Sequence, residues 1–250
     1  TADGTMTISG TGAMKEDYNT YYSPAYDNEN IKKVVIEDGV TSIGEYAFSG
    51  CRSLTDITIP GSVTSIGTYA FSGCTALTEV LLENGSTLTS ENFGEVADKV
   101  VIRWNEGNLT WTLDAEGTMA ISGTGAMKNY GTNNSPAAQK KASVKKVVIE
   151  DGITSIGDYA FFDCSSLTSI EIPEGVTSIG EFVFFSCYKL TEVFLENGSK
   201  LTSGNLGVDE SIIGTYWNEG DLTWTLTADG TMTISGTGAM KNYYKGSPAY

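Results

Sequence analysis

Hydrophobic and polar positions recur in a regular pattern over much of the chain. Residues 31–53 and 54–76 align end to end on the pattern Val-Thr-Ser-Ile-Gly-x-Tyr-Ala-Phe-Ser-Gly-Cys. Ahead of this pattern, Ile57 and Ile59 alternate with polar residues, as in a β-strand, and Pro60 ends the alternation. The pattern predicts a strand in each repeat, a second extended segment at residues 63–66, a corner at Gly67 and a single helical turn.

A single unit of this repeat is too small to stay folded alone. Its few apolar side chains cannot offset the entropy of ordering the backbone until neighbouring units cover both of its faces. The sequence therefore predicts a solenoid, in which strands of successive units, here called rungs, lie parallel. A third rung begins at Leu77 and again at Leu190, but neither copy continues into Ile-Gly-x-Tyr-Ala-Phe.

A longer repeat encloses the rungs. The glycine before Ala-Met occurs at positions 12, 125 and 238, which are evenly spaced along the chain. We expect one continuous solenoid of three modules. Module 1 covers residues 1–108 with rungs from about residue 31, module 2 covers 109–221 with a hairpin at 109–122 and rungs from about residue 144, and 222–250 is a truncated third module.

The hairpin is predicted from two alternating runs, Leu109–Leu113 and Thr118–Ser122, with Glu116-Gly117 between them. Each of the two copies of Leu-Thr-Trp-Thr-Leu carries a tryptophan. We expect these tryptophans to plug the end of a three-rung stack, where they would cover an open sheet edge. Trp111 and Trp224 would then lie beside Trp104 and Trp217. Ligand binding by these tryptophans is the alternative.

Val-Thr-Ser-Ile-Gly-x-Tyr-Ala-Phe-x-x-Cys-x-x-Leu-Thr-x-Ile-x-Ile-Pro resembles the BspA-type leucine-rich repeat of bacterial surface proteins. The similarity covers residues 31–82 and 144–195. The hairpin sequence also resembles an element of large secreted proteins of gut Firmicutes. The resemblance implies a leucine-rich-repeat solenoid, mainly β, with a parallel strand ladder, short helical turns and interspersed β-hairpins. It also implies display on the bacterial cell surface and attachment to a host matrix protein or a glycan.

Composition narrows the chemistry. The chain has 250 residues and no histidine, which excludes Ser-His-Asp and Cys-His catalysis and His-ligated zinc. The net charge of −16 argues against nucleic acid as a partner, and no apolar run is long enough to cross a membrane. No signal peptide is visible at Thr1–Gly4. We expect no cofactor, no metal site and no catalytic residue.

The four cysteines occupy one repeated position. Cys51 and Cys74 are equivalent residues of successive rungs, as are Cys164 and Cys187. The repetition predicts small inward-facing thiols. The sequence does not decide whether a disulfide joins the two cysteines of each pair, because the direction of the Cβ vectors cannot be derived from it.

Candidate binding residues fall into two groups. The first comprises tyrosines of the segment after Ala-Met, whose length differs between modules as expected for a surface loop. These are Tyr18, Tyr21, Tyr22, Tyr26, Tyr130, Tyr243 and Tyr244. Amphipathic rings suit contact with a ligand, although a plain solvated loop would also explain them.

The second group is apolar residues at positions where a ligand could bind, several of which differ between modules. Val35, Leu81, Val148 and Phe194 are expected on the outer face of the sheet. Ser49 and Ser72 of module 1 become Phe162 and Phe185 in module 2. Because these phenylalanines are equivalent residues of successive rungs, they predict an aromatic ladder on one edge, which would be an interaction patch if exposed. Thickening of the core is the alternative.

These observations favour a non-catalytic extracellular binding or adhesion module with a protein or glycan ligand. A structural spacer of a larger surface protein is the alternative. A carbohydrate-active enzyme is a further alternative, since a pair of catalytic carboxylates could be present among 31 acidic residues. The ligand and the oligomeric state stay open at this stage.

Overall fold

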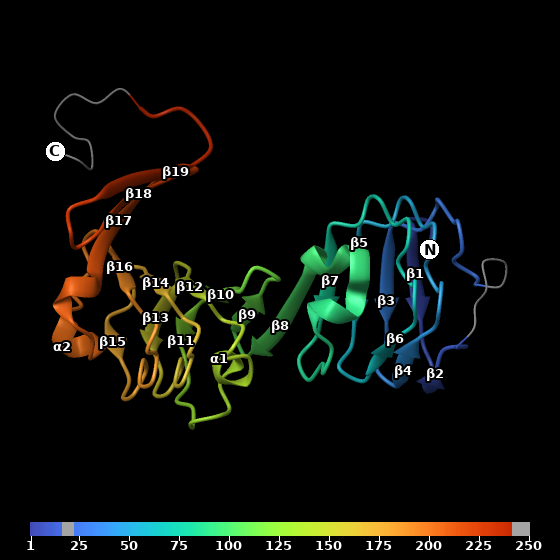
Figure 1. Ribbon diagram of the computed structural model, residues 1–250, viewed down its shortest axis with the longest axis horizontal. Coiled ribbons are helices and arrows are strands. Elements are labelled where there is room, and N and C mark those ends of the chain that lie inside the picture. The colour runs from blue at the N-terminus through green and yellow to red at the C-terminus, as the bar shows by residue number, and fades with distance from the viewer. Residues whose placement is uncertain (17–22, 242–250) are drawn as a thin grey trace. The chain divides into compact units, whose positions relative to one another are not determined.

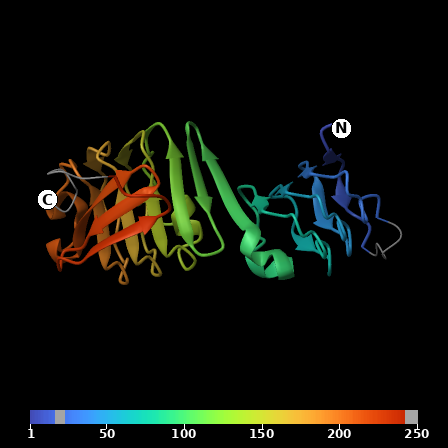
Figure 2. The ribbon, with the colours of Figure 1, turned by 90° about the horizontal axis from the view of Figure 1, so that it is seen from above.

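The computed structural model describes residues 1–16 and 23–241, which form two compact units. Unit 1 comprises Thr1–Asn105 with Thr112–Glu116, and unit 2 comprises Glu106–Trp111 with Gly117–Tyr250. Each unit is a short leucine-rich-repeat stack, mainly β, as the sequence repeat predicts. Figure 1 shows the elements of both units, and Figure 2 shows the same ribbon from above, with the strands of each ladder side by side.

The ladder of unit 1 follows the order β1-β3-β5-β7-β8. Neighbouring strands are parallel throughout. The strands are β1 (Thr5–Ile8), β3 (Lys33–Ile36), β5 (Asp56–Ile59), β7 (Glu79–Leu82) and β8 (Val100–Glu106). The second extended segment of each rung forms a smaller parallel sheet. It contains β2 (Gly12–Ala13), β4 (Val40–Ile43) and β6 (Ser65–Ile66).

Inward-facing residues of successive rungs stack in register. Val34 pairs with Ile57, and Ile57 pairs with Val80, and all three are fully buried. At the corner, a Cβ on Gly67 would clash with the backbone nitrogen of Glu45, so only glycine allows the rungs to approach this closely. The repeated apolar pattern thus places each rung directly on its neighbour.

The single helical turn predicted for each rung is not formed: Tyr46–Phe48 and Tyr69–Phe71 lie in turns, with positive φ at both tyrosines. A column of phenylalanine rings supports this side of unit 1. Phe48 stacks on Phe71 at 5.6 Å between ring centroids, and Phe71 stacks on Phe93 at 5.9 Å. Phe93 comes from a 3₁₀ segment, Ser90–Lys99, that stands where the third rung lacks the Tyr-Ala-Phe sequence. The degenerate third rung therefore still supplies a ring to the column.

Unit 2 repeats this plan and extends it. Its ladder follows the order β9-β10-β12-β14-β16-β17-β18-β19, with Leu109–Trp111 of β9 in this unit and the last two residues of β9 in unit 1. The strands from β10 to β17 are parallel, and β17, β18 and β19 are antiparallel. The strands are β9 (Leu109–Leu113), β10 (Thr118–Gly123), β12 (Lys146–Ile149), β14 (Ser169–Ile172), β16 (Glu192–Glu196), β17 (Ile213–Glu219), β18 (Leu222–Leu226) and β19 (Met232–Gly236).

The smaller elements of unit 2 lie in the connections. A second parallel sheet contains β11 (Gly125–Ala126), β13 (Ile153–Ile156) and β15 (Ser178–Ile179). The helices are single turns: α1 (Pro136–Gln139), α2 (Ser203–Leu206) and a 3₁₀ turn at Glu210–Ile212. Ser135 caps α1, because its side chain accepts a hydrogen bond from the backbone N–H of Ala138 at 3.0 Å.

The tryptophan prediction needs a correction. Trp217 and Trp224 are paired in register at the end of the stack of unit 2, as expected. Trp111, however, is fully buried at the start of that stack, where its ring lies 5.9 Å from Phe161 and 6.0 Å from Tyr130. The ring column of unit 2 is therefore Trp111, Phe161 and Phe184, and Trp111 begins it.

Candidate functional site

Four aromatic residues of unit 2 are in ring contact at the surface: Tyr159, Phe162, Phe182 and Phe185. We call these four, together with the exposed Tyr188 that follows Phe185 in sequence, the aromatic edge. Four of them make two columns. Tyr159 stacks on Phe182 at 5.3 Å, and Phe162 stacks on Phe185 at 5.6 Å with only 8° between the ring planes. The prediction that Phe162 and Phe185 share one edge is confirmed by this stacking.

The rings of the aromatic edge reach solvent. Phe182 is 51% exposed, Phe185 55% and Tyr188 85%, while Tyr159 and Phe162 are half-buried. Large apolar side chains on the surface of a soluble domain are more informative when they are contiguous than when they are scattered. Phe162 and Phe185 therefore do more than thicken the core.

Backbone conformation projects the first column outward. Tyr159 and Phe182 both have φ of 55°, in the left-handed region that bulky residues rarely adopt. Such a conformation costs about 1–3 kcal/mol and persists only where the surroundings impose it. Here the backbone N–H of Tyr159 donates to the carbonyl of Glu181 in the next rung, at 3.0 Å. The rung-to-rung hydrogen bond holds the strained turn in place.

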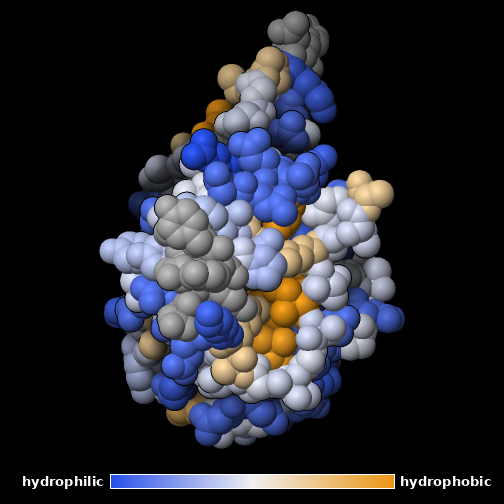
Figure 3. All heavy atoms as spheres, turned by 90° about the vertical axis from the view of Figure 1, so that its right-hand side faces the viewer, coloured by the Kyte–Doolittle hydropathy of each residue, from blue (hydrophilic) through white to orange (hydrophobic). Residues whose placement is uncertain are grey.

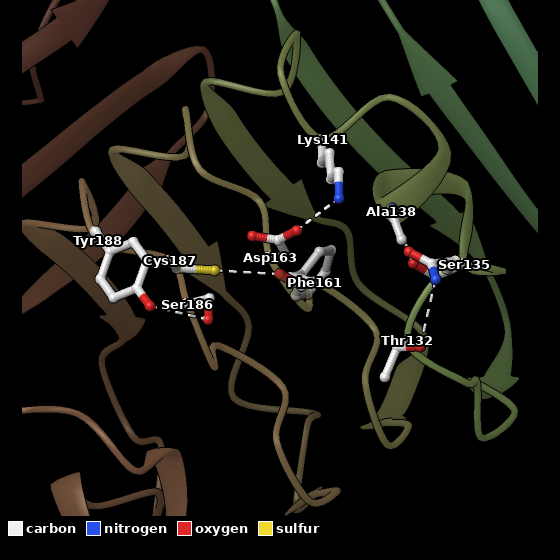
Figure 4. Close-up of polar contacts among 10 residues, drawn as sticks. Thr132, Ser135, Ala138, Lys141, Phe161, Asp163, Ser186, Cys187 and Tyr188 are labelled. Carbon is white, nitrogen blue, oxygen red and sulfur yellow. Dashed lines mark hydrogen bonds and ion pairs between the residues drawn. The ribbon is translucent and has the colours of Figure 1, made fainter.

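At two further positions with a left-handed backbone conformation, unit 2 has a residue other than glycine. Asp163 and Ser186 have φ of 57° and 65°, where unit 1 has Gly50 and Gly73. Both side chains have local partners, shown in Figure 4: Asp163 forms an ion pair with Lys141 at 2.5 Å, and the hydroxyls of Ser186 and Tyr188 are 3.2 Å apart. These contacts hold the backbone directly after Phe162 and directly after Phe185.

Carboxylates lie next to the rings in sequence. Asp158 precedes Tyr159, and the exposed Glu181 precedes Phe182. Oδ1 of Asp158 accepts a hydrogen bond from the backbone N–H of Glu181 at 2.8 Å. Aromatic faces and nearby carboxylates both attract cations, so this surface suits a ligand with basic groups.

Unit 1 carries only the first column. Tyr46 and Tyr69 stack at 5.3 Å, with φ of 54° and 57°, but Ser49 and Ser72 stand at the second column. Tyr69 also lines a groove of about 500 Å³, together with Glu91 and Glu95 of the 3₁₀ segment. The two units therefore share a scaffold and differ in the aromatic surface that the scaffold presents.

The cysteines are structural. All four are free and buried. The Cys51 thiol donates to the carbonyl of Ala25 at 3.0 Å, and the Cys187 thiol donates to the carbonyl of Phe161 at 3.1 Å, as Figure 4 shows for the second of these. Burial raises the pKa of both thiols to about 11, and that of Cys74 to about 12. They stay protonated at neutral pH and are poor nucleophiles.

Tyr130 lies in the predicted loop, but the prediction that it is an exposed contact residue was wrong. Tyr130 is 7% exposed, and its hydroxyl donates to Oε2 of Glu106 at 2.5 Å. Burial, the hydrogen bond with Glu106 and the charge of Glu106 together raise the pKa of Tyr130. Packing against Trp111 explains the burial. Tyr26 is 37% exposed, whereas Tyr18, Tyr21, Tyr22, Tyr243 and Tyr244 lie outside the described residues.

The outer-face prediction needs correction at two positions. Leu81 is 6% exposed and Phe194 is 8% exposed, so neither can serve as an open contact. Phe194 lies against β17, where a Cβ on Gly214 would be 2.9 Å from its ring. Val35 and Val148 are half-buried at the same register position of earlier rungs.

The aromatic edge includes residues that the sequence analysis missed: Tyr159, Phe182 and Tyr188. Tyr159 and Phe182 belong to the Ile-Gly-x-Tyr-Ala-Phe motif, and their equivalent positions in successive rungs were the available signal. Elsewhere, the described residues contain no group of three or more His, Cys, Asp or Glu that could hold a metal ion. None of the helices in this described part of the chain has the length and apolar character to cross a bilayer.

Comparison with known proteins gives a family. The model of the BspA-type leucine-rich repeat region matches in six copies, over residues 19–98 and 134–205. No curated protein matches the chain.

Three solved structures are similar over much of the chain. A leucine-rich repeat protein of Eubacterium ventriosum is 23% identical, with 83% of this chain and 73% of that one covered and a TM-score of 0.28. A leucine-rich cell surface protein of Faecalibacterium prausnitzii is 20% identical, covered at 75% and 59%, with a TM-score of 0.27. The pneumococcal vaccine antigen PcpA is 19% identical, covered at 79% and 62%, with a TM-score of 0.25.

The chain thus spans less than two thirds of the length of the second and third of these proteins. The family model, by contrast, covers more than half of the chain, with matches in both units. This chain belongs to the BspA-type leucine-rich repeat family.

Proposed function

We propose that the chain is a non-catalytic extracellular binding module, and that the aromatic edge of unit 2 holds a protein ligand. The observation that carries the proposal is the second ring column. Phe162 and Phe185 are stacked and accessible in unit 2, whereas the same positions in unit 1 are serines. A scaffold that only spaces other domains does not need contiguous exposed rings, which carry a risk of aggregation.

The chemistry of the aromatic edge favours a basic, partly apolar protein segment. The rings contact one another within each column and also between the columns, so their exposed parts suit side chains that lie across the surface of the aromatic edge. Asp158 and Glu181 add negative charge, and the whole chain has a net charge of −16. Lysine or arginine side chains on the ligand would be attracted both by the aromatic rings and by this negative charge.

Display on a bacterial surface is part of the same proposal. A solved structure similar to this chain is described as a leucine-rich cell surface protein. On a bacterial surface, a module of this kind would meet host matrix proteins and glycans. Tyr188 is 85% exposed and presents a hydroxyl beside a ring, a combination that glycan recognition also uses, so a glycan is the second candidate ligand.

The test is a binding array of matrix proteins and glycans, probed with this chain and with the double variant Phe162→Ser, Phe185→Ser. The variant gives unit 2 the residues of unit 1, so the scaffold is expected to stay folded. Binding should fall at least about tenfold, as when hot-spot aromatics are removed from an interface. Tyr69→Ser in unit 1 is the control and should leave binding unchanged.

Absence of binding to any ligand on the array would favour the spacer. Equal binding by the double variant and the unmodified chain would place the ligand elsewhere and refute the role of the aromatic edge. Binding to glycans alone, lost in the double variant, would assign the surface to the second candidate.

A further inference from the structure

A groove of about 500 Å³ lies between the second rung of unit 1 and the 3₁₀ segment Ser90–Lys99. Residues 66–72 line one side of it and residues 91–95 the other, so both sides are internal segments of the chain. Figure 3 shows the opposite end of this stack, where β1 lies and an apolar area is surrounded by polar side chains. Sites for small molecules commonly measure about 300–1,000 Å³, and this groove falls within that range.

The groove is present because one column of rings stops early. Tyr46 and Tyr69 stack at 5.3 Å between ring centroids in the first two rungs. The next position of this column is Asn92, whose side-chain oxygen accepts a hydrogen bond from the backbone N–H of Thr89 at 2.8 Å. Among the described residues, no ring stacks on the other face of Tyr69, which is 59% exposed. Tyr69 therefore offers an aromatic face to the groove that it lines.

A second missing ring, beside Tyr69, adds to this space. Ser72 lines the groove, and its repeat equivalent in unit 2 is Phe185. Phe185 lies edge-on to Phe182, the equivalent of Tyr69, with 6.0 Å between the ring centroids. The place that a ring takes up in unit 2 is therefore open to a ligand in unit 1.

Two carboxylates at the groove also distinguish unit 1. Glu91 and Glu95 line the groove and are exposed, whereas the equivalent positions in unit 2 are Gly204 and Val208. Oε1 of Glu95 accepts a hydrogen bond from the backbone N–H of Gly73 at 3.1 Å, which holds this carboxylate against the second rung. The residues that line the groove include no lysine or arginine, so the two carboxylates meet no opposite charge there.

The deeper part of the groove is apolar. Phe71 and Phe93 line it, are 3% and 4% exposed, and stack on each other at 5.9 Å. At Gly94, nothing lies within 4 Å of the Cβ position, so this part of the groove is open. Apolar groups of a ligand can lie here while its charged groups reach the carboxylates, in the way that a lysine stem packs on an apolar surface.

We propose that this groove, here called the acidic groove, binds a linear aliphatic polyamine. The ammonium groups of the ligand bind Glu91 and Glu95, and its methylene groups lie on the open face of Tyr69. Aromatic faces and carboxylates both attract ammonium groups, and a charge-assisted hydrogen bond is stronger than a neutral one. Two carboxylates with no basic neighbour on the lining favour a ligand with at least two positive charges. The acidic groove lies in unit 1 and the aromatic edge in unit 2, so this proposal does not depend on the ligand of the aromatic edge.

Two equivalent isoleucines allow the test. Ile66 lines the acidic groove, Ile179 is its repeat equivalent in unit 2, and both are half-buried. The chain, labelled with ¹³C at its isoleucine methyl groups, is titrated with spermidine. The signal of Ile66 should shift and saturate as the groove fills, and the signal of Ile179 should stay in place.

Conservative variants test the carboxylates. Glu91→Gln combined with Glu95→Gln removes both charges but keeps an acceptor for the backbone N–H of Gly73. Spermidine affinity should fall at least about tenfold, because two charge-assisted hydrogen bonds are lost. Glu29→Gln combined with Glu37→Gln changes the net charge by the same amount at exposed positions outside the groove, and should leave the affinity within about twofold.

Tyr69→Ser tests the aromatic face. It should weaken spermidine binding several-fold, because the methylene groups lose their contact surface and the ammonium groups lose the attraction of the ring. The same change should leave the ligand of the aromatic edge in place, so this variant tells the two sites apart.

Other outcomes would overturn the proposal. No shift of Ile66 at millimolar spermidine would show that the acidic groove does not accept a polyamine. Equal shifts of Ile66 and Ile179, or equal weakening by the two pairs of glutamine substitutions, would show general attraction of a cation to a chain with a net charge of −16. The same shift with Mg²⁺ in place of spermidine would assign the carboxylates to a metal ion. Tighter binding of a trilysine peptide than of spermidine would show that the groove takes lysine side chains of a protein.

Discussion

Phe161 and Phe162 are adjacent in sequence and identical in chemistry, yet the structure gives them opposite roles. Phe161 is fully buried between Trp111 and Phe184, with both ring centroids 5.9 Å away. Phe162 is half-buried and faces the surface column. Alanine at each position therefore separates the core column from the aromatic edge.

Removing the buried ring should be costly. A Phe→Ala change in a core lowers the free energy of unfolding by about 3–5 kcal/mol, because transfer and cavity contributions add. At a urea m-value of about 2 kcal/mol per M, the unfolding midpoint of Phe161→Ala should fall by about 2 M. Phe162→Ala loses only ring contacts at the surface, at a cost of about 1 kcal/mol, and its midpoint should fall by about 0.5 M.

Urea unfolding followed by circular dichroism measures both midpoints. Hydrogen exchange in peptides that contain β12 and β14 assigns the loss to unit 2, since units of a repeat protein can open separately. A similar drop for the two variants, or a larger drop for Phe162→Ala, would refute the assignment of Phe161 to the core and of Phe162 to the surface.

Further predictions concern the thiols and the glycine corner. The cysteines should react with a thiol reagent at neutral pH only after unfolding, and labelling of the native chain as fast as the unfolded chain would contradict this burial. Burial raises the pKa of Cys51 from 9.0 to about 11, so the free energy of unfolding should fall as pH rises through that interval. Gly123→Ala should destabilise unit 2 by more than Gly10→Ala destabilises unit 1, because both positions have positive φ but only Gly123 faces a backbone carbonyl, that of Asn108. Equal changes in melting temperature would count against that close approach.

The fold could be predicted because one local pattern is used many times. Each rung repeats the alternation that buries Val34, Ile57 and Val80, so the repeat alone is enough to indicate the ladder and its parallel direction. The hairpin could also be predicted from the sequence, and β18 and β19 do pair throughout in antiparallel register. These features depend on residues close in sequence or on strict repetition.

The candidate site could be predicted only in part from the sequence, because hydropathy does not reveal what covers a side chain. Phe185 and Phe194 are the same residue type on neighbouring segments of the chain, yet Phe185 is 55% exposed and Phe194 only 8%. Phe194 is covered by β17, which returns to the sheet after a segment outside the rungs that includes α2. Tyr130 is similarly covered by Trp111 and bound by Glu106. Such covering depends on contacts outside the repeat.

The account rests on rungs that bury one another in register. Methyl–methyl nuclear Overhauser effects in a chain labelled at Ile, Leu and Val methyls test this most directly, because neighbouring rungs are about 4.8 Å apart. We predict cross-peaks between Val34 and Ile57 and between Ile57 and Val80 in unit 1, and between Val147 and Ile170 in unit 2. Absence of cross-peaks between these equivalent residues of neighbouring rungs, in a chain that is folded by circular dichroism, would contradict the account.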